Sequence, residues 1–317
     1  MSTNPFIIEP DYYENKILAM WVSGDGRKFH THGDIQGHEG IWNAKGQVKG
    51  IYDAPVKTTW KSGAFQDGAT QKGRKVLQRD MQLGFHCIDT QGRTAEENES
   101  EFRKIFGYEI DEYDDEPEPT TLGIETEKSG LRMLDVLMYE QPDTDFDVDP
   151  IKQQHINLIL KLRAGQPMWY EEPVISKFMD GGTSASGFIE VENPTDQPMR
   201  QKWILTRGEW EVPDFSWRGK KYRRKPGGAW RSRMISVPPI TDVQGGAVIS
   251  LNKQDLMIRD VHYTNMLPLM NGKFFMHVIP PYTPKQLLPI SYKNAPAGGA
   301  MAQLIQPRLW SRPWGLE

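Results

Sequence analysis

The densest group of candidate metal ligands lies between residues 30 and 39. On a strand, His30 and His32 would point to the same face, as two ligands of one zinc ion require. Five glycines between Gly24 and Gly40 instead favour a loop or hairpin, and the spacing His-Glu-x-x-His is absent. We therefore interpret the group as polar loop residues and keep a metal-dependent envelope hydrolase, using His30, His32 and Glu39, as an alternative. The full group is His30, His32, Asp34, His38 and Glu39.

Nucleophilic catalysis needs an exposed Ser or Cys, held on a sharp turn beside a base. The single cysteine, Cys87, falls on the apolar face of a predicted strand, and one cysteine allows neither an internal disulfide nor a multi-cysteine metal site. Ser184 and Ser186 lie in a segment of small polar residues. Neither Gly-x-Ser-x-Gly nor a glycine-rich phosphate loop is present. We predict no catalytic residues, cofactor or metal, and hence no enzyme.

The segment from Arg218 to Arg233 is strongly basic. Three interpretations remain open: a phosphate-binding patch with Tyr222 and Trp230 as stacking platforms, a loop that docks on an acidic protein surface, or a solvated hairpin tip. The acidic surface would be Glu109–Glu118 of a neighbouring subunit. Tryptophans near the C-terminus are expected to anchor that segment onto its own domain or a neighbour. The predicted protein-interface residues are Arg218, Lys220, Lys221, Arg223, Arg224, Lys225, Trp310 and Trp314.

Trp203, Trp210 and Trp217 recur every seven residues, a spacing that also suits a helical stripe. Pro213 and the alternation around it favour strands instead, with the tryptophans in a core. Exposed aromatic side chains on a β-sandwich also bind sugars. A glycan-binding host-attachment module, using Trp217 and Trp230, therefore remains a second hypothesis.

Composition excludes several classes of protein. The chain has 317 residues, a net charge of −4, and no apolar run near the roughly 20 residues that span a bilayer. The nearly balanced charge argues against broad nucleic-acid binding. Met1–Pro5 lacks the basic region and apolar core of a signal peptide. We expect a protein made in a cytoplasm, with neither membrane insertion nor nucleic-acid binding.

The elements that position these residues are mostly short strands. Alternating apolar residues predict strands at 77–87, 131–139 and 155–163. One helix is expected from Thr94, where Thr94 and Glu97 form a capping box, to Gly107. The seven acidic residues between Glu109 and Glu118, interrupted by prolines, predict a loop.

The second half begins after a flexible stretch, 180–187, whose small polar residues are typical of a linker. We therefore predict two domains, 1–178 and 179–317, the second with a terminal arm. Residues 188–192 and 199–206 are expected to form a hairpin, with further strands at 247–251, 256–261 and 274–279. Short strands separated by turn residues predict a β-sandwich, and the fold class is mainly β.

A series of landmarks follows in a characteristic order. They are Gly73–Asp80, Arg132, Ile156–Leu162, Ala164–Trp169, Asn193–Asp196, Gly208, Phe274–Pro281 and the ending Arg308–Glu317. In this order they resemble the distal tail (minor tail) proteins of long-tailed bacteriophages. The ending is similar to that of minor tail proteins of phages that infect mycobacteria. The resemblance spans most of the chain.

The resemblance implies a structural protein of the virion tail tip, assembled as a ring that is usually a hexamer. An N-terminal β domain would form the ring at the end of the tail tube. A galectin-like C-terminal β-sandwich would project outward and hold baseplate or receptor-binding proteins. The implied partners are the tail tube protein, the tape measure protein, the baseplate hub and other minor tail proteins, and a host-surface glycan is the partner only under the second hypothesis. No catalytic residues come with the family. The stretches 109–118 and 218–233 match no family pattern.

Overall fold

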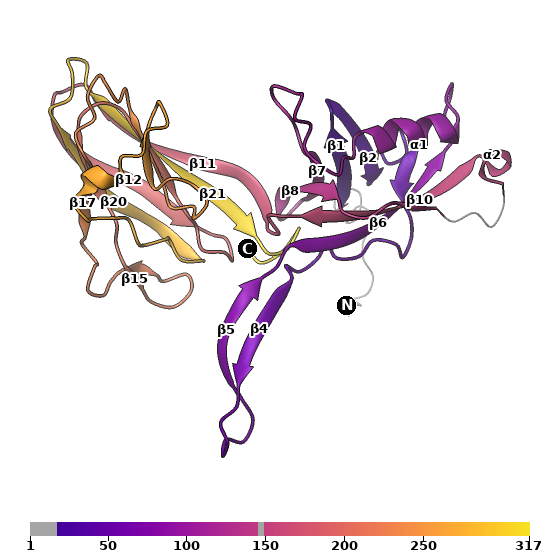
Figure 1. Cartoon of the computed structure of the whole chain (residues 1–317), viewed down its shortest axis with the longest axis horizontal. Coiled ribbons are helices and arrows are strands. Elements are labelled where there is room, and N and C mark those ends of the chain that lie inside the picture. Colours follow the sequence, from indigo (N-terminus) through magenta and orange to yellow (C-terminus); the bar gives the residue numbers. More distant parts are fainter. Residues whose placement is uncertain (1–17, 145–148) are drawn as a thin grey trace, which may run out of the picture. The chain divides into compact units, whose positions relative to one another are not determined.

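The computed structural model describes residues 18–144 and 149–317, which form two compact units (Figure 1). Unit 1 contains the described residues up to Tyr170 together with Ser311–Leu316, and unit 2 contains Glu171–Trp310. The division therefore falls between Tyr170 and Glu171. The stretch 180–187, expected to be a linker, lies inside unit 2, where residues 181–184 form the tight connection between β11 (Trp169–Asp180) and β12 (Ala185–Asn193). No helix among the described residues is long and apolar enough to cross a membrane.

Unit 1 is built on antiparallel strands that pair in the order β2–β1–β7–β8–β10–β6–β3. The short elements β9 (Asp143–Thr144) and α2 (Pro150–Gln153) precede β10. The strands are β1 (Ala19–Gly24), β2 (Arg27–His32), β3 (Ile41–Asn43), β6 (Arg79–Ile88), β7 (Thr120–Thr126), β8 (Gly130–Met138) and β10 (His155–Ala164).

Alternation of apolar and polar residues explains β6, β8 and β10, and their prediction is confirmed. Met81, Leu83, Phe85 and Cys87 of β6 are all buried, while the residues between them are mostly less so. β6 pairs along its whole length with β10, whose leucines point to the same core. Cys87 is therefore a core residue, as predicted.

The predicted helix is α1 (Ala95–Lys104), which begins at the capping box of Thr94 and Glu97. Its apolar face packs on the sheet through Phe102, which is fully buried. The ring of Phe102 lies 5.0 Å from that of Phe29 and 4.8 Å from that of Phe85. After α1, residues 109–118 form no helix or strand, so the predicted loop is confirmed. We call this segment the acidic loop.

A long hairpin, β4 (Val56–Lys61) and β5 (Thr70–Val76), extends away from the rest of unit 1 (Figure 1). Its two strands pair only with each other, and nearly every residue in them is exposed. The base is closed by a hydrogen bond from the Leu77 amide to the Pro55 carbonyl, 3.0 Å.

Unit 2 contains two larger sheets. One has the order β19–β18–β13–β21–β11 and the other β12–β20–β14–β17, and apolar side chains from both form a single buried cluster. The first comprises β11 (Trp169–Asp180), β13 (Lys202–Leu205), β18 (Ala247–Ser250), β19 (Ile258–Asp260) and β21 (Ala300–Trp310). The second comprises β12 (Ala185–Asn193), β14 (Glu209–Pro213), β17 (Met234–Ser236) and β20 (Thr283–Lys293). A two-stranded pair, β15 (Trp217–Arg218) and β16 (Lys225–Pro226), and a 3-10 turn, η2 (Leu267–Met270), complete it. The mainly β fold class is thus confirmed, and the galectin-like detail stays a prediction.

The predicted hairpin of 188–192 and 199–206 is wrong, because its two strands lie in different sheets. β12 pairs with β20, whereas β13 pairs with β18 and β21. The buried side chain of Asn193 explains the crossing. Its amide donates to the carbonyls of Gln197, Ile279 and Pro280, at 2.9 to 3.1 Å, and so satisfies backbone groups that leave the ladder.

The predicted strand at 274–279 is also wrong. The amides of Met276 and His277 donate to the carboxylate of Asp214 instead of to a neighbouring strand. Only Ile279 forms a bridge there, with Met199. The buried carboxylate of Asp214 thus accepts the hydrogen bonds that a neighbouring strand would accept if this segment were a strand.

Candidate functional site

The histidine group near the N-terminus does not converge on one point. His30, in β2, pairs through Nδ1 with Glu39 Oε1 at 2.9 Å, and its amide donates to the same carboxylate. His32 and His38 are exposed. Among residues 18–144 and 149–317, no three His, Cys, Asp or Glu side chains gather in a metal-binding arrangement. The geometry is that of a local hydrogen bond that fixes the turn after β2.

Cys87 is enclosed on β6 and points into the core with no exposed surface. Burial, with a smaller effect of Glu99, raises the pKa of its thiol to about 12. Because only the thiolate is nucleophilic, this environment suppresses reactivity.

We predict that Cys87 of the native protein resists alkylation at pH 8, where a pKa near 12 leaves about one thiol in ten thousand ionised. Iodoacetamide labelling followed by mass spectrometry should detect no adduct until urea unfolds unit 1. Rapid labelling of the folded chain would show that β6 opens, or that the thiol is not buried.

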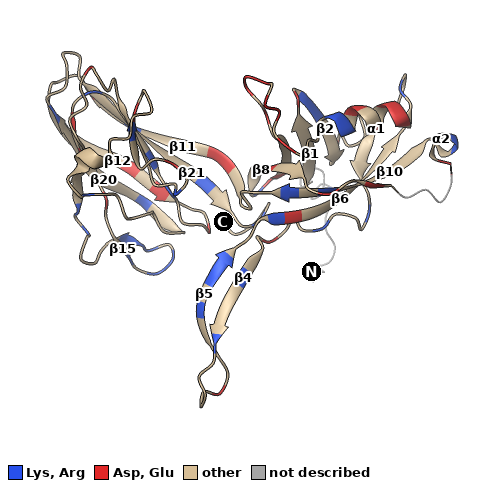
Figure 2. Cartoon of the chain, viewed as in Figure 1, with Lys and Arg blue, Asp and Glu red and all other residues tan. Residues whose placement is uncertain are grey.

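The basic segment forms a loop around β15 and β16, which we call the basic loop (Arg218–Arg233). Figure 2 shows its cationic residues beside β15, and shows the acidic loop between α1 and β7. Five of the six basic residues predicted for an interface are exposed, and Arg224 is half-buried, with Nη1 donating to the carbonyl of Pro281. The structure therefore brings these side chains together on one surface segment of unit 2.

Asp214 anchors the end of the basic loop. Its carboxylate has no exposed surface and accepts from Arg233 Nη1 at 2.6 Å. It also accepts from the amides of Met276 and His277, and His277 Nδ1 lies 3.1 Å away. No local motif marks Asp214, because its partners are distant in the sequence.

Replacing Asp214 with Ala should destabilise unit 2 by about 3 kcal/mol, since Arg233 and two amides would lose their shared acceptor. Urea unfolding, followed by hydrogen exchange in β14 and β17, measures the change. Asp242→Ala is the control, because its side chain is 86% exposed in a surface pair with Arg207, and we expect little change from it. Equal effects of the two variants would contradict the anchoring role.

The hairpin β4–β5 exposes aromatic and cationic side chains, a combination typical of a protein-binding surface. It was not predicted from the sequence. Trp60 is 57% exposed and Phe65 is fully exposed. Its strands and turn carry five cations against one acid. They are Lys57, Lys61, Lys72, Arg74, Lys75 and Asp67. The available signal was weak: residues 56–61 are rich in β-branched and aromatic types and are followed by a glycine-containing turn, whereas 70–76 are mostly polar.

Arg79 fixes the segment that leads into this hairpin. Its guanidinium is 1% exposed and donates to five backbone carbonyls at 2.8 to 3.1 Å. The acceptors are Gly50, Ile51, Asp53, Pro167 and Ser311. Burial lowers the pKa of Arg79 to about 10, although Asp53 acts in the opposite direction. The group is still protonated at neutral pH.

Residues Ser311–Leu316 return to unit 1 and hold the same segment. Arg132 Nη1 donates to the carbonyls of Arg312 and Gly315, at 3.1 and 2.9 Å. Arg312 in turn forms an ion pair with Asp53. The arm expected within the C-terminal domain therefore packs on unit 1.

The two terminal tryptophans of the predicted interface are engaged within the chain. Trp310 ends β21 with 3% of its surface exposed, so it packs in its own subunit and is not available to a partner. Trp314 is half-buried, and its ring lies 5.2 Å from that of Tyr52. Of the two, only Trp314 retains surface for a partner.

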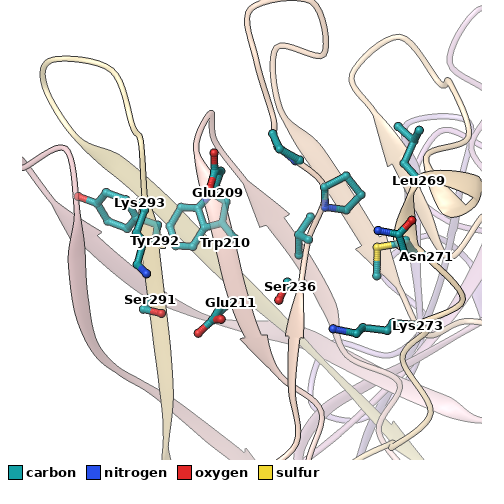
Figure 3. A pocket seen from close by; sticks show the side chains of 14 residues that line it. Glu209, Trp210, Glu211, Ser236, Leu269, Asn271, Lys273, Ser291, Tyr292 and Lys293 are labelled. Carbon is teal, nitrogen blue, oxygen red and sulfur yellow. The ribbon is translucent and has the colours of Figure 1, made fainter.

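A groove of 340 Å³ lies on unit 2 beside β14, β17 and β20 (Figure 3). Glu209 and Glu211 of β14 stand opposite Lys293 and Ser291 of β20. The side-chain amide of Asn294 donates from Nδ2 to Glu209 Oε1 at 2.9 Å. Alternating donors and acceptors of this kind suit a hydroxyl-rich ligand.

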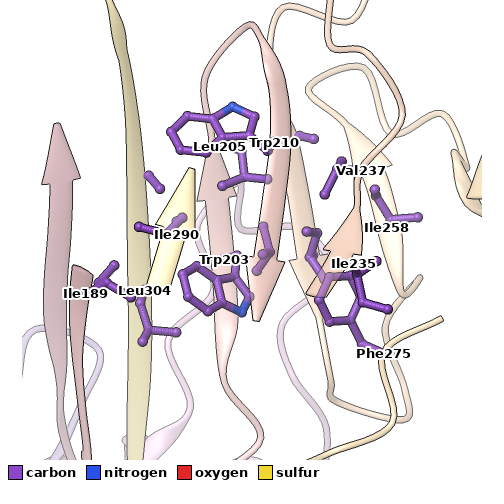
Figure 4. Close-up of a cluster of buried hydrophobic side chains, with 14 of the residues drawn as sticks. Ile189, Trp203, Leu205, Trp210, Ile235, Val237, Ile258, Phe275, Ile290 and Leu304 are labelled. Atoms are coloured by element: carbon purple, nitrogen blue, oxygen red, sulfur yellow. The ribbon is translucent and has the colours of Figure 1, made fainter. Parts of the chain in front are cut away.

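Two of the three regularly spaced tryptophans are core residues, as predicted. Trp203 and Trp210 are 1% exposed within the buried cluster of unit 2 (Figure 4). Trp217 is half-buried and packs against that cluster. Trp230, in the basic loop, is 51% exposed. Of these four tryptophans, Trp230 alone is exposed, and Tyr222 of the same loop is 60% exposed.

Comparison with known proteins supports the resemblance seen in the sequence. The chain is 24% identical to the minor tail protein Gp27 of Mycobacterium phage D29, over 92% of this chain and 96% of that protein. It is equally similar to Gp27 of Mycobacterium phage L5. Its fold resembles the crystal structure of the Dit protein of phage SPP1, with a TM-score of 0.55 and 11% identity, over 92% of this chain and 99% of that one. No protein-family description matches the chain. The resemblance to minor tail proteins is thus confirmed.

Proposed function

We infer that this chain is a structural minor tail protein of a phage particle and not an enzyme. Its relatives over nearly the whole chain are minor tail proteins. The solved protein of similar fold is described as a paradigm of the hub adsorption apparatus in phages that infect Gram-positive hosts. The finer proposal is that copies of the chain form a hexameric ring that joins the tail tube to the baseplate and host-binding parts.

The exposed hairpin β4–β5 is the main structural support for the proposed ring. A two-stranded hairpin is at best marginally stable alone, and this one exposes Trp60 and Phe65. Both outer strand edges have no partner among the described residues. A neighbouring copy that covers the hairpin would shield the aromatic side chains from water and give the open strand edges a partner. The contact is heterologous, because the hairpin meets a different surface of the next copy, and such contacts form a ring when the rotation between copies closes.

Ring faces and projecting loops would contact the other tail proteins. The proposed partners are the tail tube protein, the tape measure protein, the baseplate hub and other minor tail proteins. The cationic side chains of the basic loop are the proposed protein interface, since their positive charge needs an acidic partner surface.

The proposal is tested by mixing the purified chain with tail tube protein and measuring particle mass by mass photometry. We expect a hexameric species, and ring-shaped particles on tube ends in electron micrographs. A chain that stays monomeric at high concentration and does not bind the tube would refute the ring.

The groove beside β14 supports a second candidate function, binding of a host-surface glycan by unit 2. Its paired carboxylates and lysines match the hydroxyl groups of a sugar. A glycan array should then show saturable binding that Glu211→Ala abolishes, while Trp230→Ala tests the exposed platform. No binding on the array would leave unit 2 a purely structural element.

A further inference from the structure

Two surface loops carry opposite charge, and apart from the pair of Arg233 with Asp214 their charges have no neutralising partner among the described residues. The basic loop holds eight Lys and Arg and no acid, whereas the acidic loop, Glu109–Glu118, holds seven Asp and Glu and no base. No carboxylate of the described residues forms an ion pair with the six exposed cations of the basic loop, Arg218, Lys220, Lys221, Arg223, Lys225 and Arg231. No Lys or Arg in that part of the chain pairs with the acidic loop. Each loop thus presents unbalanced charge to solvent.

The basic loop is held in a defined shape, unlike a solvated tip. Ser216 Oγ donates to the carbonyl of Gly227 at 2.7 Å and accepts from the amide of Trp230 at 3.1 Å. The ring of Tyr222 packs against that of Tyr282 in a tilted arrangement, with centroids 4.9 Å apart, and the Tyr222 backbone amide donates to the Tyr282 carbonyl at 2.9 Å.

Strain accompanies this shape. Both tyrosines adopt left-handed backbone conformations, with φ of 62° and 53°. Such angles are costly for bulky side chains, and this kind of strain is concentrated at functional sites. The cations are therefore presented in a preorganised array, which lowers the entropy lost on binding.

The acidic loop is also ordered locally and borders a cavity. Asp111 accepts from the amide of Tyr113 at 2.9 Å, and Asp114 accepts from that of Glu116 at 3.0 Å. The cavity of 510 Å³ beneath it has apolar residues in its lining, including Phe106. Tyr113 is 90% exposed. The loop thus offers carboxylates beside a largely polar cavity and an exposed aromatic ring.

We propose that the basic loop of one copy docks on the acidic loop of a second copy. The inference rests on the proposed assembly of copies and names the surfaces that meet. Arginine forks pair with carboxylates, while Tyr222 and Trp230 supply aromatic contacts to the acidic side. The contact joins two different surfaces, as a ring requires.

The hairpin β4–β5 is the competing cationic partner for the acidic loop. Its cations are four lysines and one arginine, and Asp67 reduces their net charge. The basic loop has five arginines and no acid. Because arginine matches carboxylates in a planar, bidentate geometry, the basic loop is the better complement.

Charge reversal with rescue tests the docking. The triple variant Arg218→Glu, Arg223→Glu, Lys225→Glu should raise the concentration needed for assembly at least tenfold. The triple variant Asp111→Lys, Asp114→Lys, Glu116→Lys should do the same. A chain that carries all six changes should assemble at a concentration within threefold of that needed by the wild-type chain. Assembly that is unaffected by either triple variant, or not rescued by their combination, would overturn the docking and leave the ring intact.

Cross-linking of the phage particle gives an answer even where the isolated chain does not assemble. A zero-length carbodiimide joins lysines to carboxylates that touch. We expect links from Lys220, Lys221 or Lys225 to Glu109–Glu118. Links from the acidic loop to Lys57 or Lys72 of the hairpin instead, or to another tail protein only, would refute the proposed partner. Absence of this chain from the tail would refute the proposed function itself.

Discussion

Replacement of Arg79 with Ala is expected to destabilise unit 1 by about 3–5 kcal/mol. The change removes a buried guanidinium and leaves five carbonyl oxygens without their donor. Three of these belong to residues 50–53, which lead into the hairpin β4–β5, and one belongs to Ser311. The hairpin base and the returning segment 311–316 should therefore loosen together.

Hydrogen exchange measured by mass spectrometry separates this effect from global unfolding. Peptides covering residues 50–55, β6 and 311–316 should exchange faster, while those of β12 and β20 in unit 2 should change little. Arg163→Ala is the matched control, because Arg163 is a neighbouring arginine whose pair with Asp80 lies on the surface. Protection in Arg79→Ala equal to that in the control would contradict the role assigned to Arg79.

Deletion of the hairpin should abolish self-assembly without unfolding the subunit. Replacing residues 57–75 with an Asn-Gly turn removes Trp60, Phe65 and five cations, and the hairpin strands pair with no other strand. We expect assembly to weaken at least about 100-fold, because exposed aromatic residues of this kind dominate protein interfaces. The thermal midpoint of the monomer should stay close to that of the full chain.

Mass photometry over a concentration series measures this loss. Ile151→Ala provides the control, because Ile151 is 70% exposed on α2 and lies outside the hairpin. It should assemble like the unaltered chain. A hairpin-deleted chain that still forms rings would show that other surfaces close the assembly.

Local signals explain which parts of the fold were predictable. The alternation in β6 and β10 and the capping box of α1 depend on residues close together in the chain, and all three elements are present. The hairpin β4–β5 buries neither face, so its sequence lacks the alternation that marks a half-buried strand. The alternation rule therefore did not identify this hairpin as a candidate contact surface.

Long-range pairing explains the remaining errors. The segment 188–206 has the pattern of a hairpin, but Asn193 directs its two strands into different sheets. The buried positions of Arg79 and Asp214 depend on carbonyls and amides far away in the sequence. The basic loop was identified by composition alone, whereas its rigidity required the contacts of Ser216 and Tyr282.

Cryo-electron microscopy of the intact phage particle would show directly how copies of this chain are arranged. We expect a closed hexameric ring of this chain at the tip of the tail, with the hairpin β4–β5 covered by a neighbouring copy. A tail in which this chain occurs as isolated copies, or in which the hairpin is surrounded by solvent, would contradict it.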